Sequence, residues 1–137
     1  MIITLLKSSQ LKQQLISSSK VGSSYICTPA PTNTDIDYLI LCKDIGVTMD
    51  ILINAFRFTQ DSVLYGDTKF ISLKKTYLNK LYNIILTADR DFYASFIFAT
   101  ELSKQLNILN KADRVSIHAI IRNYWKPNMQ LKLTLPT

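Results

Sequence analysis

Asp35 and Asp37 are the residues best placed to do chemistry, because a single apolar residue separates them at the start of a strand-like segment, DIDYLILC. Side chains two residues apart on a strand project from the same face, so the two carboxylates are expected about 6–7 Å apart. Parallel carboxylates repel each other unless a cation neutralises them. Mg²⁺ binds carboxylate oxygens and leaves coordination positions open for phosphates. The pair therefore predicts a site for Mg²⁺ (or Mn²⁺).

Gly22 and Ser23 precede the acid pair and are suited to binding phosphate. A glycine lets backbone N–H groups approach a ligand closely, and the serine adds a hydroxyl donor. One site could then hold a metal–triphosphate unit between the Gly-Ser turn and the two acids. The alternative is an ordinary turn followed by a strand entrance whose acids cap nearby backbone groups. The residues alone leave both interpretations open.

Hydrophobic periodicity predicts the framework that must position these residues. Residues 2–17 place apolar side chains on one helical arc, and residues 35–42 are apolar on both faces, as in a covered strand. Between them we expect a loop at 18–34, with a short strand at 24–27, because Pro29 and Pro31 exclude helix. The other expected elements are helices at 47–58, from about 91 to 106 and at 110–124, and strands at 69–74 and 81–87. This pattern predicts an α/β (α+β) fold in a single domain, residues 1–137.

Composition narrows the class of protein without choosing a ligand. The chain has 137 residues and a net charge of +6, which favours anionic partners such as nucleotides, nucleic acid or acidic surfaces. It contains no apolar run near the roughly 20 residues of a membrane span, and we expect an intracellular protein. Cys27 and Cys42 lack the spacing of a zinc site, so we interpret both as buried thiols.

Several other residues are most simply explained by structure. Lys111, Asp113 and Arg114 resemble a helix start with a cap and a local ion pair. His118 lies among apolar residues, and we interpret it as structural. The spacing of Phe92, Phe96 and Phe98 is largely helical, so this set is assigned to the core and not to a base-stacking platform.

The order of these motifs resembles the nucleotidyltransferase superfamily typified by DNA polymerase β. The pattern of a hydrophobic residue, Gly-Ser, a spacer and Asp-hydrophobic-Asp-hydrophobic appears as VGS (21–23), residues 24–34 and DIDY (35–38). Later segments are similar to small, phage-type nucleotidyltransferases, and together the matches cover most of residues 21–122. These segments are FISLKK (70–75), YNIILTADRDFY (82–93), FAT (98–100), LNIL (106–109) and KADR (111–114).

The resemblance implies a small mixed sheet flanked by helices and the transfer of a nucleotidyl group from a nucleoside triphosphate to a hydroxyl on RNA, a protein or a small molecule. It also implies one or two Mg²⁺ ions held by Asp35 and Asp37, with phosphate contacts from Gly22 and Ser23. Lys74 stands where the phage-type pattern prefers arginine, and would meet the triphosphate as a point charge. The phage-type pattern further implies a viral source and a location in the cytoplasm of the host. Oligomeric state is left open.

This sequence differs from the superfamily pattern at the third carboxylate. Active members usually carry it on a neighbouring strand, where this sequence has Asn83, and the phage-type pattern also has asparagine there. An amide can orient a hydroxyl but cannot take its proton near pH 7. Asp89 and Asp67 are the candidate substitutes. Three hypotheses therefore remain: a nucleotidyltransferase, a non-catalytic module with the same fold that binds nucleotide, nucleic acid or protein, and a purely structural protein.

Overall fold

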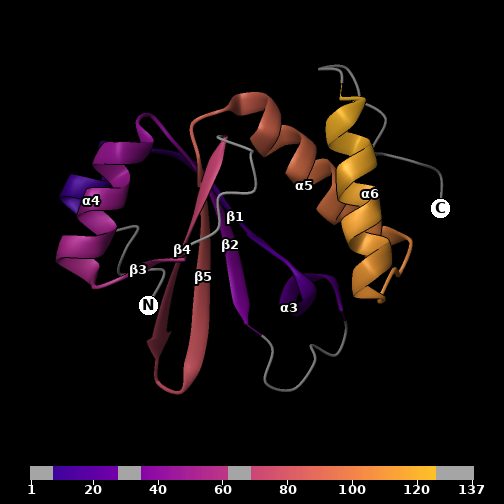
Figure 1. Ribbon diagram of the computed structural model, residues 1–137, viewed down its shortest axis with the longest axis horizontal. Helices are drawn as coiled ribbons and strands as arrows, with labels where there is room; N and C mark the ends of the chain where they lie inside the picture. Colours follow the sequence, from indigo (N-terminus) through magenta and orange to yellow (C-terminus); the bar gives the residue numbers. More distant parts are fainter. Residues whose placement is uncertain (1–7, 28–34, 62–68, 126–137) are drawn as a thin grey trace.

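The computed structural model describes residues 8–27, 35–61 and 69–125, which form helices on both sides of one five-stranded sheet (Figure 1). The strand order is β1-β2-β5-β4-β3. The sheet is mixed, because β2 and β5 run parallel while the other neighbouring pairs are antiparallel. The strands are β1 (Leu15–Val21), β2 (Ile36–Cys42), β3 (Thr59–Asp61), β4 (Phe70–Tyr77) and β5 (Lys80–Thr87). The helices are α2 (Ser9–Lys12), α3 (Ser23–Ile26), α4 (Ile45–Phe56), α5 (Arg90–Gln105) and α6 (Lys111–Asn123).

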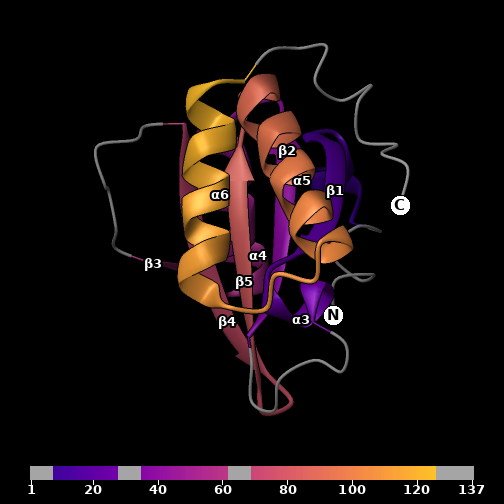
Figure 2. The same cartoon turned by 90° about the vertical axis from the view of Figure 1, so that its right-hand side faces the viewer.

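The helices divide between the two faces of the sheet. Figure 1 shows α4 on one side, with α5 and α6 on the other, and Figure 2 shows α5 and α6 side by side in front of the strands. Ile40, Leu73 and Ile84 belong to the core on the α4 face, whereas Leu39 and Phe92 belong to the core on the α5 face. The prediction of an α+β fold with helices on a small mixed sheet is therefore confirmed.

Local sequence explains where the long helices begin. Asp44, Asp89 and Asn110 each precede a helix, and each side chain accepts a hydrogen bond from the backbone N–H three residues later. This is the N-cap interaction that satisfies one of the unpaired donors of the first turn. The helix α6 differs from α4 and α5 in that none of its side chains is buried, and it packs chiefly against α5.

The predicted helix at 2–17 is wrong for the part that the structure describes. Only Ser9–Lys12 is helical, and Leu15–Val21 is a strand paired antiparallel with β2. The apolar strand β2 needs a partner on each edge, and this tertiary pairing overrides the helical periodicity of the segment. The loop predicted at 18–34, with a strand at 24–27, is also wrong over its described part, because β1 extends to Val21 and Ser23–Ile26 forms the short helix α3.

The remaining predicted elements are confirmed, with boundaries that shift by a few residues. Strand β3 was not predicted, since three polar residues carry no periodic signal. On α5 the side chains of Phe92, Ala99 and Ser103 are buried, whereas Leu106, just beyond the helix, is 59% exposed. Cys42 is buried as predicted, whereas Cys27 is only half-buried because it caps the end of α3.

Candidate functional site

One row of paired residues crosses the sheet at the start of β2. Val21 pairs with Asp37, Asp37 pairs with Asn83, and Asn83 pairs with Lys74. Directly paired residues on neighbouring strands project from the same face. Asp37, Asn83 and Lys74 therefore share the face that α5 and α6 cover, since Leu39 and Ile85, two residues further along their strands, belong to that core.

Asn83 joins the two predicted metal ligands. Its side-chain nitrogen donates to Asp35 Oδ2 at 3.1 Å and to Asp37 Oδ1 at 3.0 Å. An amide NH₂ group has two hydrogens, so a single side chain satisfies one oxygen of each carboxylate. Asp35, which directly precedes β2, and Asp37 thus lie together as predicted, and Asn83 supplies the bridge between them.

Gly22 lies directly against Asp37 at the N-terminal end of α3. Its backbone has φ 77° and ψ −172°, a region that is essentially limited to glycine. A Cβ atom at this position would lie 2.1 Å from Asp37 Oδ2 and 3.0 Å from Asp37 Cγ. The absence of a side chain at Gly22 therefore allows the chain before α3 to pass beside the carboxylate.

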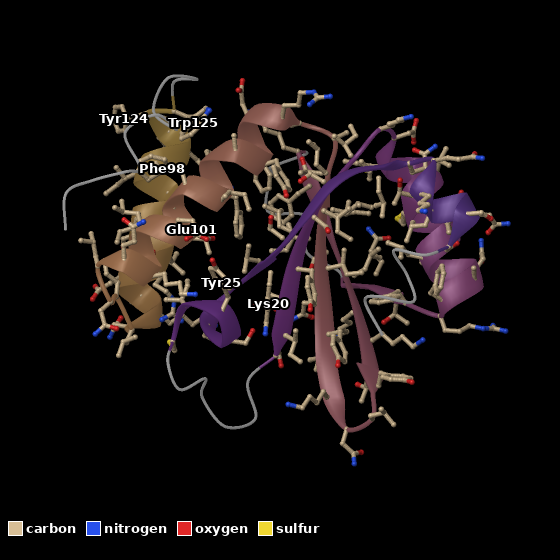
Figure 3. All side chains as sticks on the ribbon, turned by 180° about the vertical axis from the view of Figure 1, so that it is seen from behind. Lys20, Tyr25, Phe98, Glu101, Tyr124 and Trp125 are labelled. Carbon is tan, nitrogen blue, oxygen red and sulfur yellow. The ribbon has the colours of Figure 1, made fainter. Side chains whose placement is uncertain are left out.

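Contacts with α5 hold α3, and with it the Gly22 turn, in place. Tyr25 points from α3 toward Glu101 on α5 (Figure 3), and its hydroxyl donates to Glu101 Oε1 at 2.5 Å. This hydrogen bond, together with burial and the charge of Glu101, raises the pKa of Tyr25 to about 12. The Lys104 ammonium lies 3.9 Å from the centre of the Tyr25 ring, a cation–π contact. A four-residue helix thereby gains the tertiary support that its length cannot provide.

A cavity of about 580 Å³ opens between the acid pair, α5 and α6. Four residues predicted from sequence line it: Gly22, Ser23, Asp35 and Asp37. Asn83 and Lys74 are not among the described lining residues, although the register places Lys74 beside Asn83. The far end of α6 is tied to α5 by an edge-to-face contact between Trp125 and Phe98, with ring centres 5.6 Å apart (Figure 3). The helix α6 thus packs on α5 and forms one wall of the cavity.

Three basic side chains of α6 line the cavity, and the sequence did not indicate that they belong to the site. Lys111 and Arg114 lie in the first turn of α6, and the charge of Lys111 acts on Asp37. Arg122 lies in the last turn, where its guanidinium is 5.6 Å from the centre of the Phe92 ring. Residues three, four, seven or eleven apart fall on one side of a helix, so this spacing could have indicated a basic stripe. Arg114 also donates from its guanidinium to the carbonyl oxygen of Leu109, at 2.5 Å, which joins the helix start to the preceding loop.

The environment of Asp37 disfavours its charge. Burial raises the pKa of Asp37 above its usual value, and the neighbouring charge of Asp35 acts in the same direction. The hydrogen bond from Asn83 and the charge of Lys111 oppose this rise without cancelling it. The ionised form of Asp37 is therefore destabilised in the folded protein, and a bound cation would offset this effect by neutralising the charge.

We expect Asp37→Asn to raise the free energy of unfolding at pH 7 in the absence of divalent cations. An acid whose pKa is raised by folding makes the native state lose stability as pH rises from the ordinary pKa through the raised one. Above that window the full penalty is present in the wild type, and the amide of the variant removes it. Urea unfolding from pH 4 to 8 should show a difference in unfolding free energy between the variant and the wild type that grows with pH. If the two proteins were equally stable at pH 4 and at pH 8, the pKa shift would be contradicted.

The candidate substitutes for a third carboxylate do not join the site. Asp89 caps α5 by accepting from the Phe92 N–H at 2.7 Å, and it follows the opposite end of β5 from Asn83. Asp67 lies outside the described residues. In the described ranges, Asp35 and Asp37 are not joined by a further Asp, Glu, His or Cys into a group of three that could hold a metal. Asp35, Asp37 and Asn83 thus lie together and form a site of two carboxylates and one amide.

His118 and two of the phenylalanines have more to do with the cavity than predicted. Phe92 belongs to the core as expected, but it also lines the cavity with Phe96 and His118. Phe98 faces Trp125 instead. Helical spacing alone does not distinguish Phe92 and Phe96, which line the cavity, from Phe98, which contacts Trp125.

The described fold and site define an α+β protein with a five-stranded mixed sheet and an acid pair beside a glycine turn. Its fold is similar to that of the crystal structure of the conserved protein GrpB from Enterococcus faecalis, with a TM-score of 0.62. The match covers 91% of this chain and 88% of GrpB at 13% sequence identity, which is a likeness of fold. Comparison with protein-family models gives no match, and comparison with curated proteins gives no significant one. Among the described helices, none has both the length and the apolar character needed to cross a membrane.

Proposed function

We propose that this protein binds a nucleoside triphosphate with Mg²⁺ (or Mn²⁺) in the cavity and transfers the nucleoside monophosphate to a hydroxyl acceptor. The observation that carries the proposal is the contact between the Gly22 turn and Asp37, which unites the two halves of the motif at one point. The mixed sheet flanked by helices is also the fold that the resemblance to nucleotidyltransferases implies. The acceptor hydroxyl would come from RNA, a protein or a small molecule.

The residues present fit a hard divalent cation. Mg²⁺ is commonly bound by one or two carboxylates together with substrate phosphates, and needs no complete cage of protein ligands. Asp35 and Asp37 supply the carboxylates, and Asn83 engages only one oxygen of each. When bound, the cation would neutralise charge on the acids and on the phosphates. The raised pKa of Asp37 supports this assignment, since the site favours neutralisation.

Basic side chains supply the phosphate contacts. Lys111 lies near enough to Asp37 to influence it electrostatically, and Arg114, one turn along α6, lines the same cavity. Gly22 and Ser23 at the start of α3 present backbone and hydroxyl donors at the same cavity wall. Lys74 lies in the row beside Asn83 and would contact phosphates that extend past the acids. Positioning and charge stabilisation are the main means of catalysis in phosphoryl-type transfers.

The proposed step is a displacement at the α-phosphorus. The acceptor oxygen forms a bond to that phosphorus, the bond to the oxygen bridging the β-phosphate breaks, and pyrophosphate leaves. The hydroxyl proton passes to solvent, because the described residues place no third carboxylate beside Asp35 and Asp37. Without a general base the step lacks a contribution of about 10²–10⁴-fold in rate, so we expect slow turnover.

A second candidate function is nucleotide binding without transfer, and Asn83 is the observation that favours it. The amide holds the carboxylates together but cannot accept the acceptor proton. A protein of this kind would act through contact with a protein or nucleic acid, and nucleotide occupancy would alter that contact.

The decisive experiment measures binding and transfer with each labelled nucleoside triphosphate, Mg²⁺ or Mn²⁺, and cellular RNA or lysate. We expect metal-dependent binding by calorimetry and metal-dependent transfer of label, and both should be lost in the Asp35→Ala/Asp37→Ala variant. Asp50→Ala is the matched control, because Asp50 is an exposed acid on α4. Binding without transfer would favour the second candidate, while the absence of both would refute nucleotide chemistry.

A further inference from the structure

A connected series of aromatic rings lines the part of the cavity that the acid pair does not use. Phe70 and Phe92 stack with ring centres 5.1 Å apart and an interplanar angle of 18°. Phe92 and Phe96 follow at 5.9 Å, and Phe96 and His118 at 4.6 Å. All four side chains line the same cavity as Asp35 and Asp37. The cavity thus has one end with the acid pair and Lys111, and an aromatic end where the Arg122 guanidinium lies 5.6 Å from the centre of the Phe92 ring.

His118 provides a polar group in this aromatic wall. Its Nδ1 atom is buried and has no hydrogen-bond partner in the described part of the chain. Burial lowers the pKa of His118 to about 4, and the charges of Arg122 and Arg114 contribute to the same shift. The ring is therefore neutral at pH 7, with one nitrogen as donor and the other as acceptor. Burying a polar atom without a hydrogen-bond partner costs free energy, so an unpaired nitrogen is unusual in a residue whose only role is to fill space.

The two ends of the cavity are separated by a distance that a single ligand can span. Lys111 and His118 are seven residues apart on α6, which corresponds to about 10 Å along the helix axis. A ligand for both ends must join a chain of negative charges to a flat ring that carries hydrogen-bonding groups. A nucleoside triphosphate has this chemistry, and bases stack on aromatic and histidine side chains.

We propose that the ring of Phe96 and the neutral ring of His118 form the base-binding end of the cavity, and that His118 selects among nucleobases. This inference rests on the proposed function, since it takes the acid pair and Lys111 as the triphosphate end. The aromatic rings supply stacking, which every base can use, while the imidazole distinguishes bases by their donor and acceptor patterns. His118 is thus a specificity-determining residue and takes no part in the transfer step.

The test compares ligands with and without a base. With Mg²⁺ present, we expect at least one nucleoside triphosphate to bind about tenfold more tightly than inorganic tripolyphosphate, because a base that stacks on aromatic rings stabilises the bound nucleotide. His118→Phe keeps a ring beside Phe96 but removes both nitrogens. It should reduce the spread of affinities among the four nucleoside triphosphates and leave the affinity for tripolyphosphate unchanged.

Two further variants keep the outcome clear. His118→Leu also removes both nitrogens, so it should reduce the spread of affinities in the same way, and it replaces His118→Phe if that protein fails to fold. Lys111→Met should weaken every triphosphate and tripolyphosphate equally, as expected for a phosphate contact. If all four nucleotides bind no more tightly than tripolyphosphate, or if selectivity survives both His118 substitutions, the base-binding role is refuted and the proposed function stands. If neither nucleotide nor tripolyphosphate binds with Mg²⁺, the proposed function fails and this inference fails with it.

Discussion

Replacing Gly22 with alanine should disable the site and destabilise the fold by about 2–4 kcal/mol. The backbone at this position has φ 77° and ψ −172°, where a side chain is strained whatever the surrounding space. The new methyl group would also lie 2.1 Å from Asp37 Oδ2, so the carboxylate would have to rotate away from Asn83. We therefore expect metal-dependent nucleotide affinity to fall at least about tenfold, measured by calorimetry on the folded fraction.

Gly46 offers the matched control for this substitution. It lies in the first turn of α4 on the other face of the sheet, and an added Cβ would meet only Asp44 Oδ1 at 3.3 Å. Gly46→Ala should leave nucleotide affinity unchanged and alter stability by less than about 1 kcal/mol, because alanine is favoured in helices. If Gly22→Ala proved as harmless as Gly46→Ala, the close packing of Gly22 on Asp37 would be disproved.

Asn83→Asp should make the fold depend on divalent cations. The substitution removes two hydrogen bonds to carboxylates and places a third negative charge beside them, which costs at least about 2 kcal/mol at pH 7. For a chain of this size we expect the melting temperature to fall by about 5–10 °C without metal and to recover with millimolar Mg²⁺. If nucleotidyl transfer is limited by the missing base, its rate should also rise, by up to about 10²-fold.

Two comparisons separate the effect of charge from that of the lost hydrogen bonds. Asn83→Ala removes the hydrogen bonds without adding charge, so its loss of stability should respond less to Mg²⁺. Asn54→Asp makes the same chemical change at an exposed position of α4 and should have no metal-dependent effect. A variant Asn83→Asp as stable as the wild type in the presence of a chelator would show that the amide does not hold the acids together.

The sequence was sufficient for the acid pair because the relevant constraint is local. Alternation along an extended segment places Asp35 and Asp37 on one face regardless of what surrounds them. Both side chains accept a hydrogen bond from Asn83. The strands β2, β4 and β5 were also predictable from their apolar runs, and Asp44, Asp89 and Asn110 mark helix starts through contacts within four residues.

The parts that could not be predicted depend on tertiary pairing. Residues 15–21 have mixed periodicity, and their strand conformation is decided by the free edge of β2. Lys111 and Arg114 were interpreted as part of a helix start, because their relation to the acid pair is set by how α6 packs on α5. Likewise, His118 looked like a core residue because it has apolar neighbours in sequence, while its ring lies at a cavity wall.

The way in which α6 is attached has a consequence for its dynamics. With no buried side chain of its own, α6 contributes little to the cooperative core, and its contacts run chiefly to α5. Segments of this kind open locally at a free-energy cost below that of global unfolding. Amide hydrogens of α6 should therefore exchange sooner than those of β2 and β5, and a molecule entering the cavity can gain access by partial release of one helix while the sheet stays intact.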